Sequence, residues 1–135
     1  MLGNVSFRKV FHALERAINI TQQRNTYIIS NISNLDTPHY MPKDIDFKTT
    51  MARVLESTQR PALTRTHSGH MDVRNTSASH IEPFEDSKEW NGYNWVNIDR
   101  EMIKMSENNL MHRTAVEILL RKIATLKEVI KEGGR

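Results

Sequence analysis

The N-terminal third of the chain carries a stripe of residues spaced alternately four and three apart. The pattern is unbroken from position 7 to position 35, and this spacing places its members on one face of a helix. The stripe comprises Phe7, Phe11, Leu14, Ile18, Thr21, Asn25, Ile28, Ile32 and Leu35. Pro38 follows soon after and disfavours helical geometry in the residue before it. We therefore predict a long helix that ends in a turn near residue 35.

The C-terminal third repeats this heptad pattern. Its stripe comprises Ile98, Met102, Met105, Asn109, His112, Val116, Leu119, Ile123, Leu126 and Ile130. Asn97 is placed to cap the start of a second long helix, because its side-chain oxygen can accept hydrogen bonds from the first free backbone N–H groups. Gly133 and Gly134 are typical of the end of a helix.

The two stripes match when the helices are antiparallel, with Leu35 opposite Ile98. In this alignment the polar members of the two stripes fall in the same two layers: Thr21 lies opposite His112 and Asn25 opposite Asn109. Unpaired buried polar groups are costly, and a polar layer can fix the register of a coiled coil. The residues leave open the alternative that this polar gap faces solvent or another subunit. The predicted fold class is mainly α, a coiled-coil-like antiparallel pair of long N- and C-terminal helices with a small irregular and β middle segment.

The middle of the chain, residues 48–96, is rich in Ser, Thr, His, Asn and Pro. We predict a short helix over 48–56, weak strands over 61–66 and 70–73, and an irregular connector that contains Trp90, Tyr93 and Trp95. Such a short polar stretch cannot build a core of its own. We therefore expect one structural domain in three parts: 1–47 with the first helix and its turn, 48–96 as the connector, and 97–135 as the second helix.

Composition narrows the classes of function. Only 38% of the 135 residues are hydrophobic and the mean hydropathy is −0.59, so folding is expected to be completed by neighbours that bury more surface. The net charge of +3 is scattered along the chain rather than clustered, which does not suggest nucleic-acid binding. The absence of cysteine excludes disulfides, thiolate chemistry and cysteine-based zinc sites. From the sequence we expect no membrane-spanning stretch and no secretory signal at the N-terminus.

Two groups of side chains resemble chemical sites. His67 and His70 have a spacing that suits a metal on a helix, but Ser68 and Gly69 favour a turn there, and the sequence places no third ligand. Asp44 and Asp46 alternate as on an extended segment, and we interpret them as solvated carboxylates flanking a packed Ile45. No phosphate-binding loop or nucleophile motif is present. We predict no enzymatic activity, no cofactor and no metal.

The turn after the first helix is the most specific motif. It reads Asn-Ile-Ser-Asn-Leu-Asp-Thr-Pro-His-Tyr over positions 31–40 and Lys-Asp-Ile-Asp-Phe over 43–47. This strongly resembles the signature of the flagellar rod and hook proteins, and residues 66–70 and 97–110 resemble further segments of its proximal rod members. His39 stands where that family usually has Gly, so a turn with positive φ is less favourable there. The resemblance implies structural or interaction roles for Asn31, Asn34, Asp36, Thr37, Pro38, Tyr40, Asp44, Asp46 and Phe47.

The resemblance implies a structural subunit of the proximal rod in the flagellar basal body, in the periplasmic space. Such a subunit would be exported by the flagellar type III apparatus without a cleavable signal peptide. It would polymerise into the drive shaft, line the export channel and be required for motility. The implied partners are copies of itself, the next rod proteins along the axis, a FliE-like adaptor at the export gate, and the export apparatus, with no nucleic acid and no small-molecule substrate. The alternative is a cytosolic helical-hairpin adaptor, which explains both heptad stripes but not the signature turn.

Overall fold

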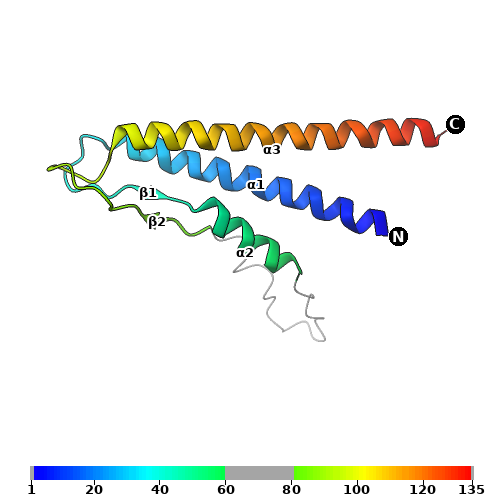
Figure 1. Ribbon diagram of the computed structural model, residues 1–135, viewed down its shortest axis with the longest axis horizontal. Helices are drawn as coiled ribbons and strands as arrows, with labels where there is room; N and C mark the ends of the chain where they lie inside the picture. Colours follow the sequence, from blue (N-terminus) through cyan, green and yellow to red (C-terminus); the bar gives the residue numbers. More distant parts are fainter. Residues whose placement is uncertain (1, 60–80, 135) are drawn as a thin grey trace, which may run out of the picture.

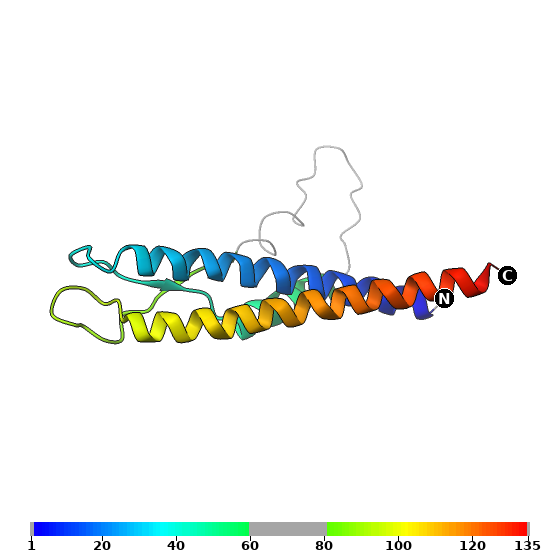
Figure 2. The same cartoon turned by 90° about the horizontal axis from the view of Figure 1, so that it is seen from above.

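The protein is an elongated helical hairpin with a shorter helix along one side (Figure 1). The computed structural model describes residues 2–59 and 81–134. Helix α1 (Leu2–Ser33) and helix α3 (Ile98–Gly133) run antiparallel, so the N- and C-termini lie at one end and the connecting loops at the other (Figure 1 and Figure 2). Helix α2 (Phe47–Gln59) packs against α1, where Ile20 and Val54 are buried. The predicted fold class is confirmed.

Side-chain caps mark the end of α1 and the start of α3. The Asn34 side chain donates to the Ser30 carbonyl at 2.8 Å, and the Thr37 hydroxyl donates to Asn34 Oδ1 at 3.1 Å, which closes the end of α1. At the start of α3, Asn97 Oδ1 accepts from the N–H groups of Asp99 and Arg100 at 3.0 and 3.2 Å. Both ends therefore form where the sequence predicts them, because short polar side chains satisfy backbone groups that the helices leave free.

The middle segment contributes a helix and a very short sheet. The helix predicted over 48–56 is α2, which is capped by the exposed carboxylate of Asp46: its Oδ1 accepts from the N–H groups of Lys48 and Thr49. Strands β1 (Lys43–Asp44) and β2 (Phe84–Glu85) pair antiparallel, with Lys43 opposite Glu85. The strands predicted over 61–66 and 70–73 lie outside the described residues. The sheet thus ties the segment after α1 to the segment before α3.

The helix pair has the predicted alignment but uses a different face of α3. All members of the α1 stripe are buried or half-buried. On α3, one line of the predicted heptad is retained from its second member on: Met105, His112, Leu119 and Leu126 are half-buried, whereas the first member, Ile98, is 44% exposed, so its predicted burial is wrong. Most of the other line, which comprises Met102, Asn109, Ile123 and Ile130 with the half-buried Val116, is exposed. Residues one position earlier take its place: Glu101, Asn108 and Ala115 are buried. The prediction that Met102 and Asn109 face α1 is therefore wrong.

Hydrogen bonds across the interface explain why α3 is rotated about its axis relative to the predicted packing. The Asn108 side chain donates to the carbonyl of Thr21 at 2.8 Å, and Asn31 donates to Glu101 Oε2 at 2.8 Å. These bonds require Glu101 and Asn108 to face α1, whereas hydrophobicity alone favours Met102. A buried amide without partners would cost more than leaving a methionine in water.

The rotated face of α3 predicts a contrast between two adjacent asparagines. Replacing Asn108 with Ala removes a buried hydrogen bond and leaves a cavity, so we expect the free energy of unfolding to fall by about 1–3 kcal/mol. Replacing the exposed Asn109 with Ala should change it by less than about 0.5 kcal/mol. Urea unfolding followed by circular dichroism measures both. Equal losses in the two variants would contradict the assigned face.

Candidate functional site

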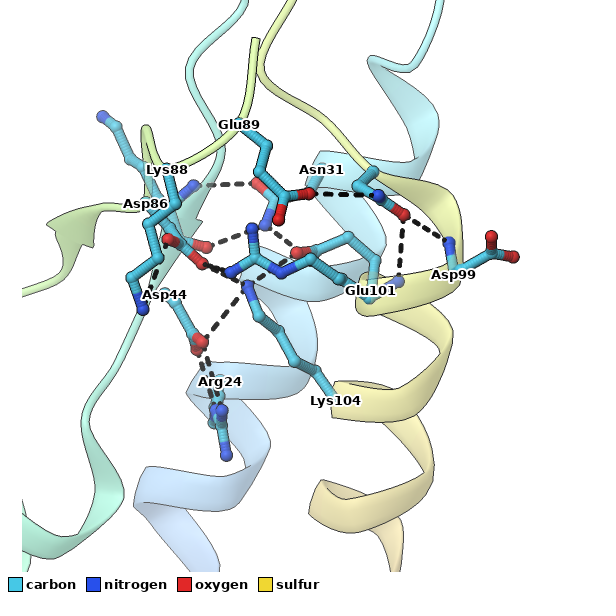
Figure 3. A network of polar contacts seen from close by, with 12 residues as sticks. Arg24, Asn31, Asp44, Asp86, Lys88, Glu89, Asp99, Glu101 and Lys104 are labelled. Atoms are coloured by element: carbon cyan, nitrogen blue, oxygen red, sulfur yellow. Dashed lines mark hydrogen bonds and ion pairs between the residues drawn. The ribbon is translucent and has the colours of Figure 1, made fainter. Parts of the chain in front are cut away.

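A cluster of charged side chains lies between the two long helices and the short sheet (Figure 3). One part of it is a bidentate ion pair between α1 and the end of β1. Arg24 Nε lies 2.8 Å from Asp44 Oδ1, and Arg24 Nη2 lies 3.1 Å from Asp44 Oδ2. Such paired guanidinium–carboxylate contacts fix both position and orientation. Asp44 is 4% exposed, so its interpretation as a solvated carboxylate is wrong.

Lys104 on α3 joins this pair to the other carboxylates of the cluster. Its Nζ lies 2.7 Å from Glu101 Oε1, 2.9 Å from Asp86 Oδ2 and 3.4 Å from Asp44 Oδ2. Arg100 completes the cluster through a 2.9 Å contact between its Nη2 and Asp86 Oδ2. Three cations and three carboxylates therefore connect α1, β1, the segment after β2 and α3. We call these six side chains the ion cluster: Arg24, Arg100, Lys104, Asp44, Asp86 and Glu101.

Asn31 extends the ion cluster to the backbone of β1 and to the signature turn. Its amide donates to the Lys43 carbonyl at 2.8 Å as well as to Glu101, and its Oδ1 accepts from the Lys43 N–H at 2.9 Å. The hydroxyl of Tyr40 also donates to Asn31 Oδ1 at 3.3 Å. A single asparagine, fully buried, thus holds α1, β1 and α3 together.

The pKa directions show that opposite charges outweigh burial in the ion cluster. Burial alone raises the pKa of Asp44, but the hydrogen bond and charge of Arg24, with the charge of Lys104, bring it below its ordinary value. Burial likewise raises the pKa of Asp86, and Lys104 and Arg100 more than reverse this effect. Burial lowers the pKa of Lys104, yet its carboxylate partners leave it raised. All three groups are charged at neutral pH, so the cluster suits a structural clamp and not proton transfer.

The other signature residues shape the loop end of the hairpin. Asp36, Thr37 and Pro38 are exposed and Phe47 is half-buried. The Asp36 carbonyl accepts from the Tyr93 hydroxyl at 2.9 Å, which links the turn to the connector. His39 has φ of +58°, the left-handed conformation that the substitution of the usual Gly makes less favourable.

The predicted polar layer is only partly brought together. Thr21 Oγ1 lies 2.9 Å from His112 Nδ1, and Asn25 is half-buried. Asn109 is exposed, so its predicted place in the layer is wrong, and Asn108 lies at the interface instead. The displacement follows from the rotated face of α3.

Sequence reasoning missed Arg24, Asp86, Glu101 and Lys104. Their signal was ambiguous: Arg24, Glu101 and Lys104 are charged residues beside an apolar stripe, Asp86 lies in the polar connector, and most such residues are solvated. Only the folded chain shows that β1 and the segment after β2 bring partners to them.

A second feature is the apolar flank that the rotation leaves uncovered on α3. Its exposed residues are Met102, Ile103, Leu110, Leu120, Ile123 and Ile130, with Ile130 72% exposed. Uncovered apolar side chains that follow one helix are typical of a surface that another protein covers. We call this set the apolar flank.

Residues 2–59 and 81–134 contain neither a metal site nor a membrane-spanning helix. Among residues 2–59 and 81–134, no group of three or more His, Asp or Glu side chains is arranged to hold a metal ion. His67 and His70 lie outside these ranges. No helix within them has the length and apolar character needed to cross a bilayer.

The lowered pKa of Asp44 predicts acid sensitivity. Because the folded-state pKa lies below the unfolded value of about 4, the stabilising contribution is present above that value and is lost as the pH falls through the folded value. Replacing Asp44 with Asn leaves Arg24 without its partner, so we expect a loss of about 3 kcal/mol at pH 7 and a flatter dependence of stability on pH below about 5.

Asp46→Asn is the matched control, because Asp46 is exposed and Asn is also a good N-cap. The hydrogen bonds from Thr49 and Lys48 also lower the pKa of Asp46, but these groups are exposed, so the loss at pH 7 and the flattening of the pH dependence should both be much smaller than for Asp44→Asn. Urea unfolding between pH 3 and pH 7 measures both variants. The same pH dependence in Asp44→Asn and the wild type would contradict a stabilising role for the Asp44 charge.

Comparison of the sequence with known proteins places the chain in a family. No protein-family profile matches the chain. It is 31% identical over 127 residues to the flagellar basal body rod protein FlgB of Salmonella typhimurium, covering 89% of this chain and 91% of the relative. The FlgB protein of Bacillus subtilis is 29% identical over 129 residues, covering 94% and 97%, and that of Aquifex aeolicus is 29% identical over 117 residues, covering 87% and 89%. The chain therefore belongs to the family of the flagellar basal body rod protein FlgB.

Proposed function

We propose that this protein is a structural subunit of the proximal rod of the flagellar basal body, where it polymerises into the drive shaft and lines the export channel. The proposal includes that the protein has no enzymatic activity and that the cell requires it for motility. Its partners are copies of itself, the next rod proteins along the axis, a FliE-like adaptor at the export gate, and the export apparatus that delivers it without a cleavable signal peptide. Family membership supports the rod, and the shape of the hairpin supports polymerisation.

The observation that carries the proposal is the uneven packing of the helix pair. Around the ion cluster, side chains of both helices are fully buried. Toward the termini the helix pair has little buried core. In residues 7–16 no side chain is fully buried, and in residues 120–134 Leu126 alone is half-buried while the others are exposed. A helix pair that ends without a core gains stability when neighbours cover its apolar flank.

This packing also suits export. Amphipathic helices whose stability comes from packing can pass unfolded through a narrow channel and then fold against subunits already in place. A cytosolic adaptor made of a helical hairpin would present the same flank, but membership of a rod-protein family favours the rod.

The apolar flank predicts a variant that folds but does not assemble. Replacing both Ile123 and Ile130 with Ser removes apolar side chains that are exposed in the single chain, so the unfolding free energy should change by less than about 0.5 kcal/mol for each. Assembly should fail, because the same side chains are buried between subunits. In a strain that lacks the gene, the variant should restore neither hooks nor swimming.

Lys122→Ser with Glu132→Ser is the matched control, since both residues are exposed and polar on the same part of α3. It should restore swimming. The rod assignment would be overturned by a deletion strain that still builds hooks and swims. Normal assembly of the Ile123 and Ile130 variant would overturn the role of the apolar flank.

Assembly-dependent folding is a separate prediction. In dilute solution the terminal halves of α1 and α3 should fray, so circular dichroism should show less helix than the structure contains, and helix content should rise with protein concentration. The region around the ion cluster should stay folded. Full helicity at the lowest concentrations would contradict this expectation.

A further inference from the structure

The turn after α1 contains a backbone conformation that its side chain does not favour. Among the non-glycine residues of the described ranges, His39 alone has positive φ, at +58°. In this left-handed region the Cβ atom lies too close to the following carbonyl oxygen, a cost that glycine avoids and that Asn and Asp offset through local hydrogen bonds. Within residues 2–59 and 81–134 the His39 ring forms no hydrogen bond. Other contacts must therefore stabilise the backbone here.

The ring of Trp90 supplies such a contact. It stacks on the imidazole of His39, with ring centroids 5.7 Å apart and planes 15° apart. Trp90 in turn lies against Trp95, whose ring centroid is 4.3 Å away and which is half-buried. A stacked aromatic pair stabilises a fold by about as much as a left-handed non-glycine residue destabilises it. The stack can therefore offset the cost of the conformation at position 39.

Gly92 shows the alternative way of reaching positive φ in the same part of the molecule. Its φ is +91°, and apart from its chain neighbours no heavy atom lies within 4 Å of the place where a Cβ would stand. Glycine reaches this conformation without the help of a ring contact. At His39, by contrast, the left-handed turn and a ring contact occur together.

Two backbone hydrogen bonds depend on the φ of His39. Its own N–H donates to the Tyr93 carbonyl at 3.0 Å, and the carbonyl of the next residue, Tyr40, accepts from the N–H of Trp95 at 3.2 Å. One of these bonded groups precedes the Cα of His39 and the other follows it, so rotation about φ moves one bond relative to the other. The left-handed conformation thus lets both bonds form, and they join the turn to the connector before α3.

The 48% exposure of Trp90 has two physical explanations. An exposed tryptophan on a fixed loop can be a contact for another protein, since such residues often dominate binding. It can also remain at the surface because its stacking partner, His39, is itself exposed. The nearly parallel rings and the conformation at position 39 favour the second explanation, because a docking residue has no need of a left-handed neighbour.

We propose that Trp90 is a positioning residue for the turn after α1 and not a contact for another protein. Its ring holds His39 in the left-handed conformation, which sets the hydrogen bonds between the turn and the connector. The two residues form a compensating pair, because the ring of one offsets the backbone cost of the other. The test in cells rests on the proposed function, whereas the test on the isolated protein does not.

Hydrogen exchange of the His39 and Trp95 amides, followed by NMR, tests the pair. Trp90→Ala leaves the left-handed turn without support, so the protection of both amides should fall about tenfold. Adding His39→Gly should restore most of this protection, because glycine adopts positive φ at little cost. His39→Gly alone should change it by less than about threefold. The protection of Asn108, in the middle of α3, should stay the same in all three variants.

Phe84→Ala is the matched control, because Phe84 is 44% exposed on β2 and its ring is not part of the stack. It should leave the protection of both amides unchanged, with or without His39→Gly. Trp90→Leu keeps an apolar side chain without an aromatic ring, so it should lose protection as Trp90→Ala does. It serves in its place if circular dichroism shows that Trp90→Ala does not fold.

Two results on the isolated protein would overturn the inference. Unchanged protection in Trp90→Ala or Trp90→Leu would show that the ring does not hold the turn. Equal loss of protection in Trp90→Ala and in the double variant would show that the backbone of residue 39 is not the reason for the loss.

In a strain that lacks the gene, His39→Gly should act as a suppressor of Trp90→Ala. The Trp90→Ala chain should restore little swimming, and the double variant should restore most of it, because its turn again has the bonded geometry. A tryptophan that contacts another protein could not be replaced by a change at position 39. Failure of the double variant to swim, despite restored protection, would therefore overturn the positioning role.

The rod assignment has a different test. A deletion strain that still swims would overturn the proposed function, and hydrogen exchange would then decide the role of Trp90 by itself. Failure of the compensating pair in hydrogen exchange, in a protein whose deletion abolishes hooks and swimming, would overturn the inference and leave the proposed function in place.

Discussion

The fold depends on one contact above the others, the placement of Asp44 between Arg24 and Lys104. The carboxylate lies at the end of β1, and its two cations come from different long helices. A buried carboxylate without them would be strongly destabilising, and so would either cation without the carboxylate. The helices and the sheet segment are therefore held in a single arrangement in this region. Asn31 and Asp86 extend the same arrangement to the backbone of β1 and to Arg100.

This constraint also determines which face of α3 meets α1. Glu101 must face inward to reach Asn31 and Lys104, and Asn108, two turns later, then meets the carbonyl of Thr21. Met102 and Asn109 are turned outward as a result. The exposure of Met102, Ile123 and Ile130 is thus a consequence of buried polar bonding, because these bonds turn the polar line of α3 toward α1 and this apolar line away from it.

The hairpin has different physical properties along its length. Near the loops, ion pairs, amide hydrogen bonds and buried aliphatic side chains hold the helices together. Toward the termini few side chains are covered, and the outer surface is basic and apolar. A subunit built in this way has a folded part that keeps its shape and an open part whose stability depends on neighbours. That division suits the proposed role of a subunit that completes its folding in an assembly.

Local patterns in the sequence are enough to predict the helices, their antiparallel alignment and their ends. Heptad spacing, the caps at Asn34 and Asn97, and the turn at Pro38 each depend on residues close together in the chain. The signature turn indicates the family for the same reason, since its motif is a continuous run of residues. The positive φ of His39 agrees with the strain expected where a glycine is usual.

The face of α3 and the burial of Asp44 depend instead on the folded chain. Both involve partners 60 to 87 residues away, as in the contacts between Asp44 and Lys104 and between Thr21 and Asn108. Hydrophobic periodicity treats Glu101 and Asn108 as surface residues, because it assigns polar side chains to water. Their burial is favourable only when the folded chain supplies a carbonyl, an amide or a lysine at hydrogen-bonding distance, and no local pattern records that distance.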